Sequence, residues 1–103
     1  MTQEDLKWKI VDVCKTIMDP EIPHSIIDLG LIYSIDVHED FTVDVQMTLT
    51  TPSCGFGPEF LNLVHSRING LEEVKEARVE LVWDPPWNQS MIKEEIQFEM
   101  GLW

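Results

Sequence analysis

The sequence predicts an α/β domain: a two-layer α+β sandwich with the order α-β-β-α-β-α, whose helices pack on one face of a three-stranded mixed or antiparallel sheet. Two segments carry apolar residues at helical spacing, and three alternate apolar and polar residues as half-buried strands do. Segments rich in proline and glycine separate them. Because 103 residues are the length of one domain, we expect a single domain over residues 1–103.

The first predicted helix begins after Thr2 and ends near Met18. Thr2 and Asp5 have the spacing of a capping box, and Pro20 disfavours helical geometry in the residue before it. The apolar stripe of this helix consists of Leu6, Ile10, Val13, Cys14 and Ile17. Because Cys14 lies on the stripe, we interpret it as a buried structural thiol.

The next two predicted elements form an antiparallel hairpin. Residues 31–37 and 41–49 alternate in polarity, and the polar residues 38–40 separate them. This alternation is typical of a hairpin with one dry face and one largely polar face.

A helix, a strand and a short helix follow the hairpin. Pro58 is tolerated at the first position of a helix, and Gly70 is suited to a left-handed stop at its end. Residues 77–83 alternate as a third strand, with Trp83 on the apolar face. Ser90 has the position of an N-cap for the last helix.

Composition excludes several classes of function. Seven basic residues against nineteen acidic ones give a formal charge of −12, whereas nucleic-acid and anionic-membrane surfaces need clustered Lys and Arg. No apolar run approaches the ~20 residues of a membrane span, and the first residues have no signal-peptide core. We therefore expect a cytoplasmic protein with two free thiols that binds neither nucleic acid nor membrane.

Three loops contain the candidate functional residues. They are DPEIP at 19–23, TTPSCGFGP at 50–58 and WDPPW at 83–87. Two follow strand ends and one precedes a strand. Because a hairpin reverses the chain direction, all three can lie at one edge of the sheet. Trp87 there suits a rigid anchor for a partner protein or a lid over the cysteine.

Cys54 is the residue with the clearest chemical potential. A thiol just before a helix start lies near unpaired N–H groups and the positive end of the helix dipole. Both favour the thiolate, which attacks disulfides and binds soft metals. The alternative is a small apolar residue packed under a turn, and the residues alone leave both interpretations open.

A self-sufficient metal site or active site is not expected. The sequence has no C-x-x-C pair, and its histidines, at 24, 38 and 65, have no ligand spacing. An iron–sulfur cluster takes four protein thiolates or a mixture with histidine. Cys54 can therefore bind a cluster only by sharing it with another chain or an external thiol. The acidic loop residues Asp19, Glu21, Asp28 and Asp84 suit either a carboxylate cluster or ordinary turns.

Three motifs together resemble a known family. DPEIP…IIDLGLIY, TLTTPSC and VWDPPW…M, in this order, resemble the SufT/PaaD-like iron–sulfur assembly family, formerly a domain of unknown function. The resemblance covers residues 4–101. It implies a fold like the C-terminal domain of NifU-type scaffold proteins and a role in maturing iron–sulfur proteins. Assembly machinery and client apoproteins are the implied partners, and one branch serves a phenylacetyl-CoA ring-oxygenating complex.

The resemblance also implies site residues. The family's reactive cysteine falls on Cys54, which is the only metal ligand we expect. The residues expected around a transient iron–sulfur cluster are Cys54, Thr51, Asp19, Glu21, Asp28 and Trp87. One departure is that Gly55-Phe56-Gly57 stands where the family has a proline directly after the cysteine.

We therefore expect a non-enzymatic accessory factor of iron–sulfur cluster assembly. Through Cys54 it would carry or target clusters, with the cluster shared across a homodimer or with a client. One alternative is an adaptor that binds no metal and recruits clients while Cys54 is merely packed. Another is a PaaD-like subunit of a ring-oxygenating complex.

Overall fold

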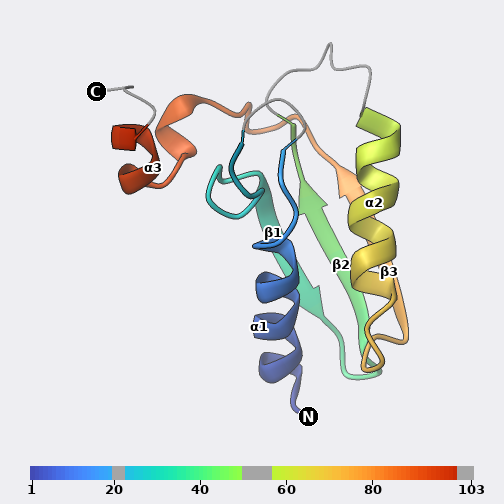
Figure 1. Cartoon of the computed structure of the whole chain (residues 1–103). Coiled ribbons are helices and arrows are strands. Elements are labelled where there is room, and N and C mark those ends of the chain that lie inside the picture. The colour runs from blue at the N-terminus through green and yellow to red at the C-terminus, as the bar shows by residue number, and fades with distance from the viewer. Residues whose placement is uncertain (20–22, 50–56, 100–103) are drawn as a thin grey trace.

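The computed structural model describes residues 1–19, 23–49 and 57–99, and it confirms the predicted class and element order. The elements are α1 Gln3–Cys14, β1 Ile32–Val37, β2 Thr42–Met47, α2 Gly57–Asn69, β3 Glu76–Leu81, the 3₁₀ turn η1 Gln89–Met91 and α3 Glu94–Glu99 (Figure 1). Within the described ranges, no helix is long and apolar enough to cross a membrane.

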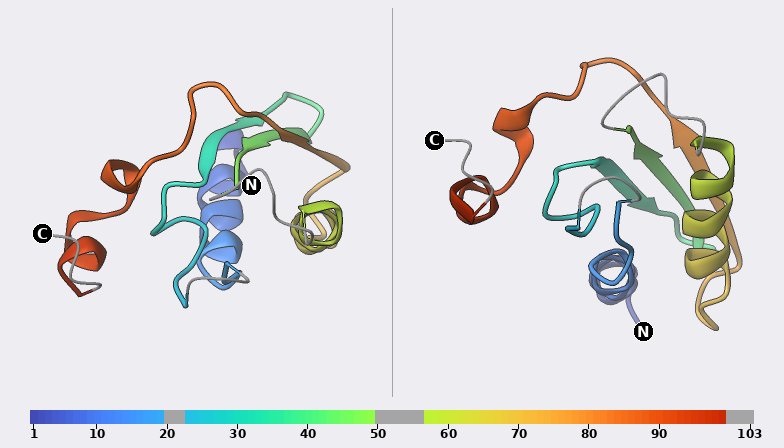
Figure 2. Two further views of the ribbon diagram at one scale, coloured as in Figure 1. Left: turned by 90° about the horizontal axis from the view of Figure 1, so that it is seen from above. Right: turned by 45° about the horizontal axis from the view of Figure 1, so that its top comes forward.

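The sheet is mixed and has the strand order β1-β2-β3. β1 pairs antiparallel with β2, whereas β2 and β3 are parallel because α2 connects them as a crossover. Figure 2 shows α1 and α2 on the same face of the sheet. The short α3 departs from the prediction that all helices share this face, since it lies to one side, beyond the upper end of β1 (Figure 1).

The capping box of α1 is confirmed. The Asp5 N–H donates to Thr2 Oγ1 at 3.0 Å, and the Thr2 N–H donates to the Asp5 carboxylate at 3.2 Å. The helix ends at Cys14 rather than near Met18. Met18 instead forms an isolated antiparallel bridge with Ser25, so the chain turns back sooner than the proline alone predicts.

One hydrophobic core joins the inner face of the sheet to both long helices. Its fully buried members include Leu6, Ile10, Cys14, Leu31, Val43, Met47, Val64 and Ile68. The interpretation of Cys14 as a buried structural thiol is confirmed, because the residue is 0% exposed. Burial raises the pKa of the Cys14 thiol to about 11, since an apolar surrounding disfavours the thiolate.

The predicted end of the third strand is wrong in one respect. β3 stops at Leu81, and the Val82 N–H then donates to the Met47 carbonyl at 2.8 Å. Trp83 lies past this point and is 44% exposed, so it is not a core residue.

Two predicted helix boundaries are also corrected. Gly70 follows α2 but does not have the left-handed conformation, which among the described glycines belongs to Gly30 alone. Near the end of α2, the Asn69 side chain accepts the Ala77 N–H at 3.0 Å. The predicted cap Ser90 lies inside the 3₁₀ turn η1, before α3, and the N-cap of that turn is Asn88, whose side chain accepts the Ser90 N–H at 2.9 Å.

Candidate functional site

The described parts of the three loops lie at one edge of the sheet, as predicted (Figure 1). The start of β1 and the ends of β2 and β3 meet there, because β1 runs antiparallel to the other two strands. The Thr48 N–H donates to the Leu31 carbonyl at 2.8 Å, which joins the end of β2 to the segment before β1. We call this side of the molecule the loop end.

Half of the predicted site residues lie outside the described ranges, namely Glu21, Thr51 and Cys54. Asp19 is buried at 7% exposure, and its N–H donates to the His24 carbonyl at 3.0 Å. Asp28 and Trp87 both take part in contacts at the loop end between the segment before β1 and residues 84–98. We call residues 84–98 the C-terminal arm.

Asp28 is bonded to the C-terminal arm twice. Its carboxylate lies 3.1 Å from Lys93 Nζ, and its carbonyl accepts the Lys93 N–H at 2.8 Å. The Asp28 N–H donates to Ser25 Oγ at 3.1 Å, which fixes the turn that presents it. These contacts hold the arm beside the segment that leads into β1.

Trp87 connects the C-terminal arm to the segment before β1 at a second position. Its indole N–H donates to the Leu29 carbonyl at 2.7 Å, and its half-buried ring packs against the core. Tyr33 adds a further link, because its hydroxyl donates to the Pro85 carbonyl at 2.7 Å and lies 3.6 Å from Met91 Sδ. The strand pattern had predicted a packed position for Trp83. The structure instead places Trp87 in such a position.

Gly30 is required by the close approach of the arm. Its φ of 72° lies in the left-handed region, which glycine adopts without steric cost. A Cβ at this position would overlap the Met91 carbonyl oxygen. We call Asp28, Gly30, Tyr33, Trp87 and Lys93 the clasp.

Tyr33 and Lys93 are members of the clasp that the sequence patterns did not single out. Tyr33 ends the motif IIDLGLIY, which singled out Asp28 for a different reason. One feature of the sequence could have pointed to Lys93 as a contact for the acidic loop, since it is the only basic residue between position 84 and the last residue.

A shallow hollow of about 520 Å³ lies where the arm meets the sheet. Its lining residues are Gly30, Ile32, Tyr33, Gln46, Asp84, Pro85 and Met91. One carboxylate, Asp84, beside the polar side chains of Tyr33 and Gln46 is no set of metal ligands. Across residues 1–19, 23–49 and 57–99, no three or more His, Cys, Asp or Glu residues are grouped to hold a metal ion. Asp19, Asp28 and Asp84 therefore do not form such a carboxylate cluster.

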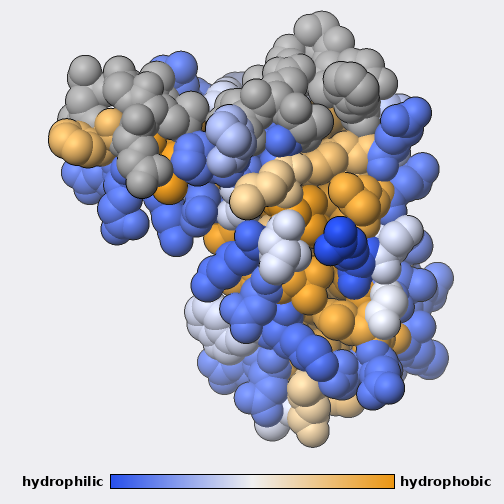
Figure 3. Space-filling view, viewed as in Figure 1, coloured by the Kyte–Doolittle hydropathy of each residue, from blue (hydrophilic) through white to orange (hydrophobic). Residues whose placement is uncertain are grey.

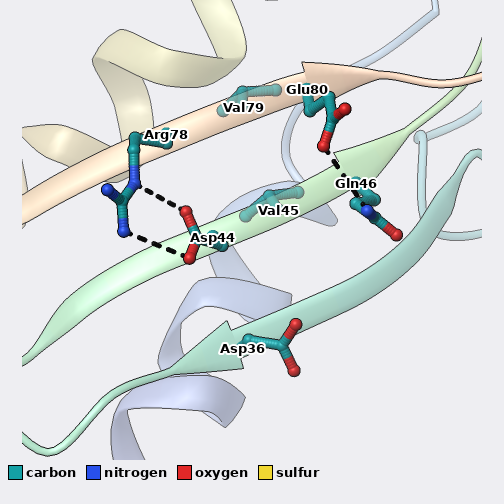
Figure 4. Close-up of a pocket in the computed structure, with 7 residues that line it drawn as sticks. All are labelled: Asp36, Asp44, Val45, Gln46, Arg78, Val79 and Glu80. Carbon is teal, nitrogen blue, oxygen red and sulfur yellow. Dashed lines mark hydrogen bonds and ion pairs between the residues drawn. The ribbon is translucent and has the colours of Figure 1, made fainter.

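A second hollow, of about 570 Å³, lies on the face of the sheet opposite the helices. Figure 4 shows Asp44 there, accepting two hydrogen bonds from Arg78 at 2.7 and 3.2 Å. His38 Nε2 lies 2.7 Å from the same carboxylate. His38 and then Arg78 lower the pKa of Asp44. This hollow is a solvated surface with an ion-pair network, and it offers no nucleophile or metal ligand set.

The thiol chemistry of the chain therefore depends on its other cysteine. The chain has two cysteines, and a pKa of about 11 makes the buried Cys14 a poor thiolate. Cys54 lies three positions before Gly57, where α2 begins.

Comparison with protein families gives a match over most of the chain. Residues 7–81 match the family described as iron–sulfur cluster assembly protein. The Fe-S protein maturation auxiliary factor of Porphyromonas gingivalis is 40% identical over 101 residues, which are 98% of this chain and 92% of that protein. The Fe-S protein maturation auxiliary factor YitW of Bacillus subtilis is 33% identical, over 97% of this chain and 98% of that protein.

Known structures share the fold. The crystal structure of a domain of unknown function, DUF59, from Bacillus anthracis aligns with a TM-score of 0.89 and 26% identity, over 98% of this chain and 96% of that one. A conserved hypothetical protein of Thermotoga maritima aligns with a TM-score of 0.80 and 32% identity, over 98% of this chain and 95% of that one.

Proposed function

The chain belongs to the family of iron–sulfur cluster assembly proteins, and we propose that it is a non-enzymatic auxiliary factor in the maturation of iron–sulfur proteins. The relatives named as maturation auxiliary factors match it over nearly their whole length, which supports a like role here. Its partners would be the assembly machinery and client apoproteins in the cytoplasm. The cluster would be its cargo.

Cys54 is the residue that would contact the cargo. Its position in the sequence shortly before the 13-residue helix α2 supports a thiolate there, because free N–H groups and the helix dipole favour an anion at a helix start. Burial excludes Cys14 from this task. The burial of Cys14, which leaves Cys54 as the other thiol of the chain, is the single observation that carries the proposal.

A single available thiol also restricts how a cluster can be bound. Clusters take four thiolate or imidazole ligands, and no ligand group of three or more occurs in the described part of the chain. Cys54 would therefore share the cluster with a second copy in a homodimer or with a client. Gly55-Phe56-Gly57 after it leaves the backbone approachable for a bulky ligand.

The other proposed site residues divide into two groups. Asp19, Glu21 and Thr51 remain candidates for residues around the cluster. For Asp28 and Trp87, the hydrogen bonds to Lys93 and Leu29 favour an indirect role, in which they position the C-terminal arm beside the site. Their substitution should therefore change cluster delivery less than substitution of Cys54.

Complementation tests this function. In cells that lack the gene, we expect the wild-type protein and Cys14→Ala to restore the activity of iron–sulfur enzymes, and Cys54→Ser to fail at equal protein level. Cys14→Ala is the matched control, since it removes the other thiol without adding a buried polar group. Full restoration by Cys54→Ser would show that the thiol is not needed.

The second candidate function is an adaptor that recruits clients without holding a cluster. The observation that favours it is the engagement of Asp28 and Trp87 in structural contacts rather than in a ligand set. An adaptor predicts that Trp87→Ala abolishes co-purification of the assembly machinery while Cys54→Ser leaves it intact. The cargo-binding role predicts that Cys54→Ser impairs the maturation of iron–sulfur enzymes more than Trp87→Ala does.

A further inference from the structure

Strand β1 has a free edge along the sheet. β1 pairs with β2 alone, so its other side has no strand partner in the described chain. The Val37 carbonyl points to this side, because it accepts a hydrogen bond from Gln3 Nε2 at 2.9 Å. The next residue, His38, points inward and donates its N–H to the Thr42 carbonyl at 2.9 Å. Backbone direction alternates in an antiparallel pair, so Ile35 also points its N–H and carbonyl outward.

Two hollows, of about 340 and 300 Å³, lie along this free edge, and the hollow of about 520 Å³ beside the arm, which Gln46 of β2 also lines, adjoins them at the start of β1. The first two share the lining residues Lys7 and Ile35. The second and third share Ile32 and Tyr33. We call these adjoining hollows beside β1 the edge groove.

The edge groove has defined walls. Helix α1 forms one wall through Lys7 and Val11, and Pro85 and Met91 of the C-terminal arm close its far end. Figure 3 shows the arm projecting from the body, with the outline hollowed beneath it. The six residues of β1 span about 20 Å, which is the length of one added strand.

The edge groove has an apolar floor and an acidic rim. Ile32, Ile35 and Val37 form the floor, and they are buried or half-buried. The rim carries the carboxylates of Glu4, Asp36 and Asp84, against one cation, Lys7. Alternate side chains of a strand that binds here would contact the apolar floor, and the side chains between them would lie near the carboxylates of the rim.

We propose that the edge groove binds an extended segment of a partner protein, alternately apolar and basic, as a fourth strand against β1. Strand addition supplies affinity through main-chain hydrogen bonds and specificity through alternate side chains. A second copy of this chain is the poorer occupant, because a two-fold β1–β1 contact would bring its acidic rims together. The proposal depends neither on Cys54 nor on a cluster, so it stands or fails separately from the proposed function.

Two synthetic octapeptides test it on the full chain: acetyl-KVKVKVKV-amide and acetyl-EVEVEVEV-amide. In ¹⁵N NMR titrations we expect the lysine peptide to shift the amides of 32–37 saturably. The glutamate peptide should bind at least about tenfold more weakly. A lysine peptide that is methylated on alternate backbone nitrogens keeps its charge but loses hydrogen-bond donors, so its affinity should also fall about tenfold.

Charge-reversal variants separate the edge groove from general attraction to an acidic protein. Glu4→Lys with Asp36→Lys should weaken binding of the lysine peptide about tenfold. Glu76→Lys with Glu80→Lys, on β3, changes the net charge equally and should leave binding within about twofold.

Three results would overturn the proposal. One is no shift at β1, and another is equal weakening by the two double variants. The third is a peptide-independent, concentration-dependent dimer with shifts at β1, which would identify a second copy as the occupant.

Discussion

The two ends of the sheet are held together in different ways. At the hairpin end, residues close in sequence close the turn, since the Phe41 N–H donates to the His38 carbonyl at 2.9 Å, and longer-range bonds such as that from the Lys75 N–H to the Phe41 carbonyl at 3.0 Å add to it. At the loop end, the bonds join residues far apart in sequence, such as Trp87 to Leu29 and Lys93 to Asp28. The described residues of the family resemblance, among them Asp28, Gly30 and Trp87, gather at the loop end. The fold is thus closed locally at one end and clasped at the other, where the proposed site lies.

This difference predicts different responses to substitution. A clasp of a few long-range contacts can open without unfolding the core, because regions with few buried apolar contacts open at lower free energy. At the hairpin end, the turns are continuous with the paired strands. Substitutions at the loop end should therefore free the C-terminal arm, whereas those at the hairpin end should act on the whole domain.

The largest effect is expected at Gly30. Gly30→Ala places a Cβ against the Met91 carbonyl at a φ of 72°, and we expect it to lower the free energy of unfolding by about 2–3 kcal/mol. The matched control is Gly70→Ala near the hairpin end, whose Cβ would lie 3.1 Å from the Ser66 carbonyl oxygen without positive φ. Urea denaturation measures both. Equal losses would contradict the difference between the two ends.

The second effect compares two tryptophans in one loop. Trp87→Ala removes a half-buried ring and its hydrogen bond to Leu29, so we expect a loss of about 2 kcal/mol. Trp83 is 44% exposed, and Trp83→Ala should cost under about 0.5 kcal/mol. Denaturation followed by circular dichroism provides the measurement. A larger loss of unfolding free energy for Trp83→Ala than for Trp87→Ala would contradict the assignment of Trp87 as the residue that anchors the arm.

The third effect concerns ion pairs at the two ends. A double-mutant cycle of Asp28→Asn and Lys93→Met should give a coupling energy of about 0.5–1 kcal/mol, which falls at high salt. The control pair is Lys9 and Glu73, which lie 2.8 Å apart. Breaking the first pair should speed hydrogen exchange in α3, whereas Glu73→Gln should not. Faster α3 exchange in both variants would mean that the arm is not clasped by Asp28.

The smallest effect is the pH dependence of Asp44 near the hairpin end. His38 and Arg78 lower its pKa from the ordinary 3.8. A carboxyl whose pKa is lowered by folding stabilises the fold above its unfolded pKa, and this contribution is lost as the pH falls through the folded pKa. Asp44→Asn should therefore destabilise the domain at pH 7 and cease to do so under strong acid. Denaturation across pH 2–7, with exposed Asp36→Asn as control, checks this sign.

Much of the fold could be predicted because its signals are local. The capping box of α1, the hairpin and the start of α2 depend on residues within a few positions of one another. The shared edge of the three loops followed from the reversal at the hairpin. Local patterns did not show that β3 ends with its pairing to β2, so Trp83 was expected in the core and Trp87 was expected as an anchor for a partner protein or a lid over the cysteine.

The candidate site was predictable in its residues more than in their roles. Asp28, Gly30 and Trp87 were singled out by motif, yet their contacts with the C-terminal arm depend on the path of residues 84–98. No periodicity encodes that path. Cys54, Thr51 and Glu21 lie outside the described residues, so their place in the site remains a prediction.

The most direct test of the account is anaerobic reconstitution of the purified protein with ferrous iron and sulfide, measured by visible absorption and iron analysis. We expect wild type and Cys14→Ala to form a chromophore with about half a cluster per chain, as a shared site requires, and Cys54→Ser to form none. A chromophore that survives Cys54→Ser, or none in any folded variant, would contradict a cargo-binding role for Cys54.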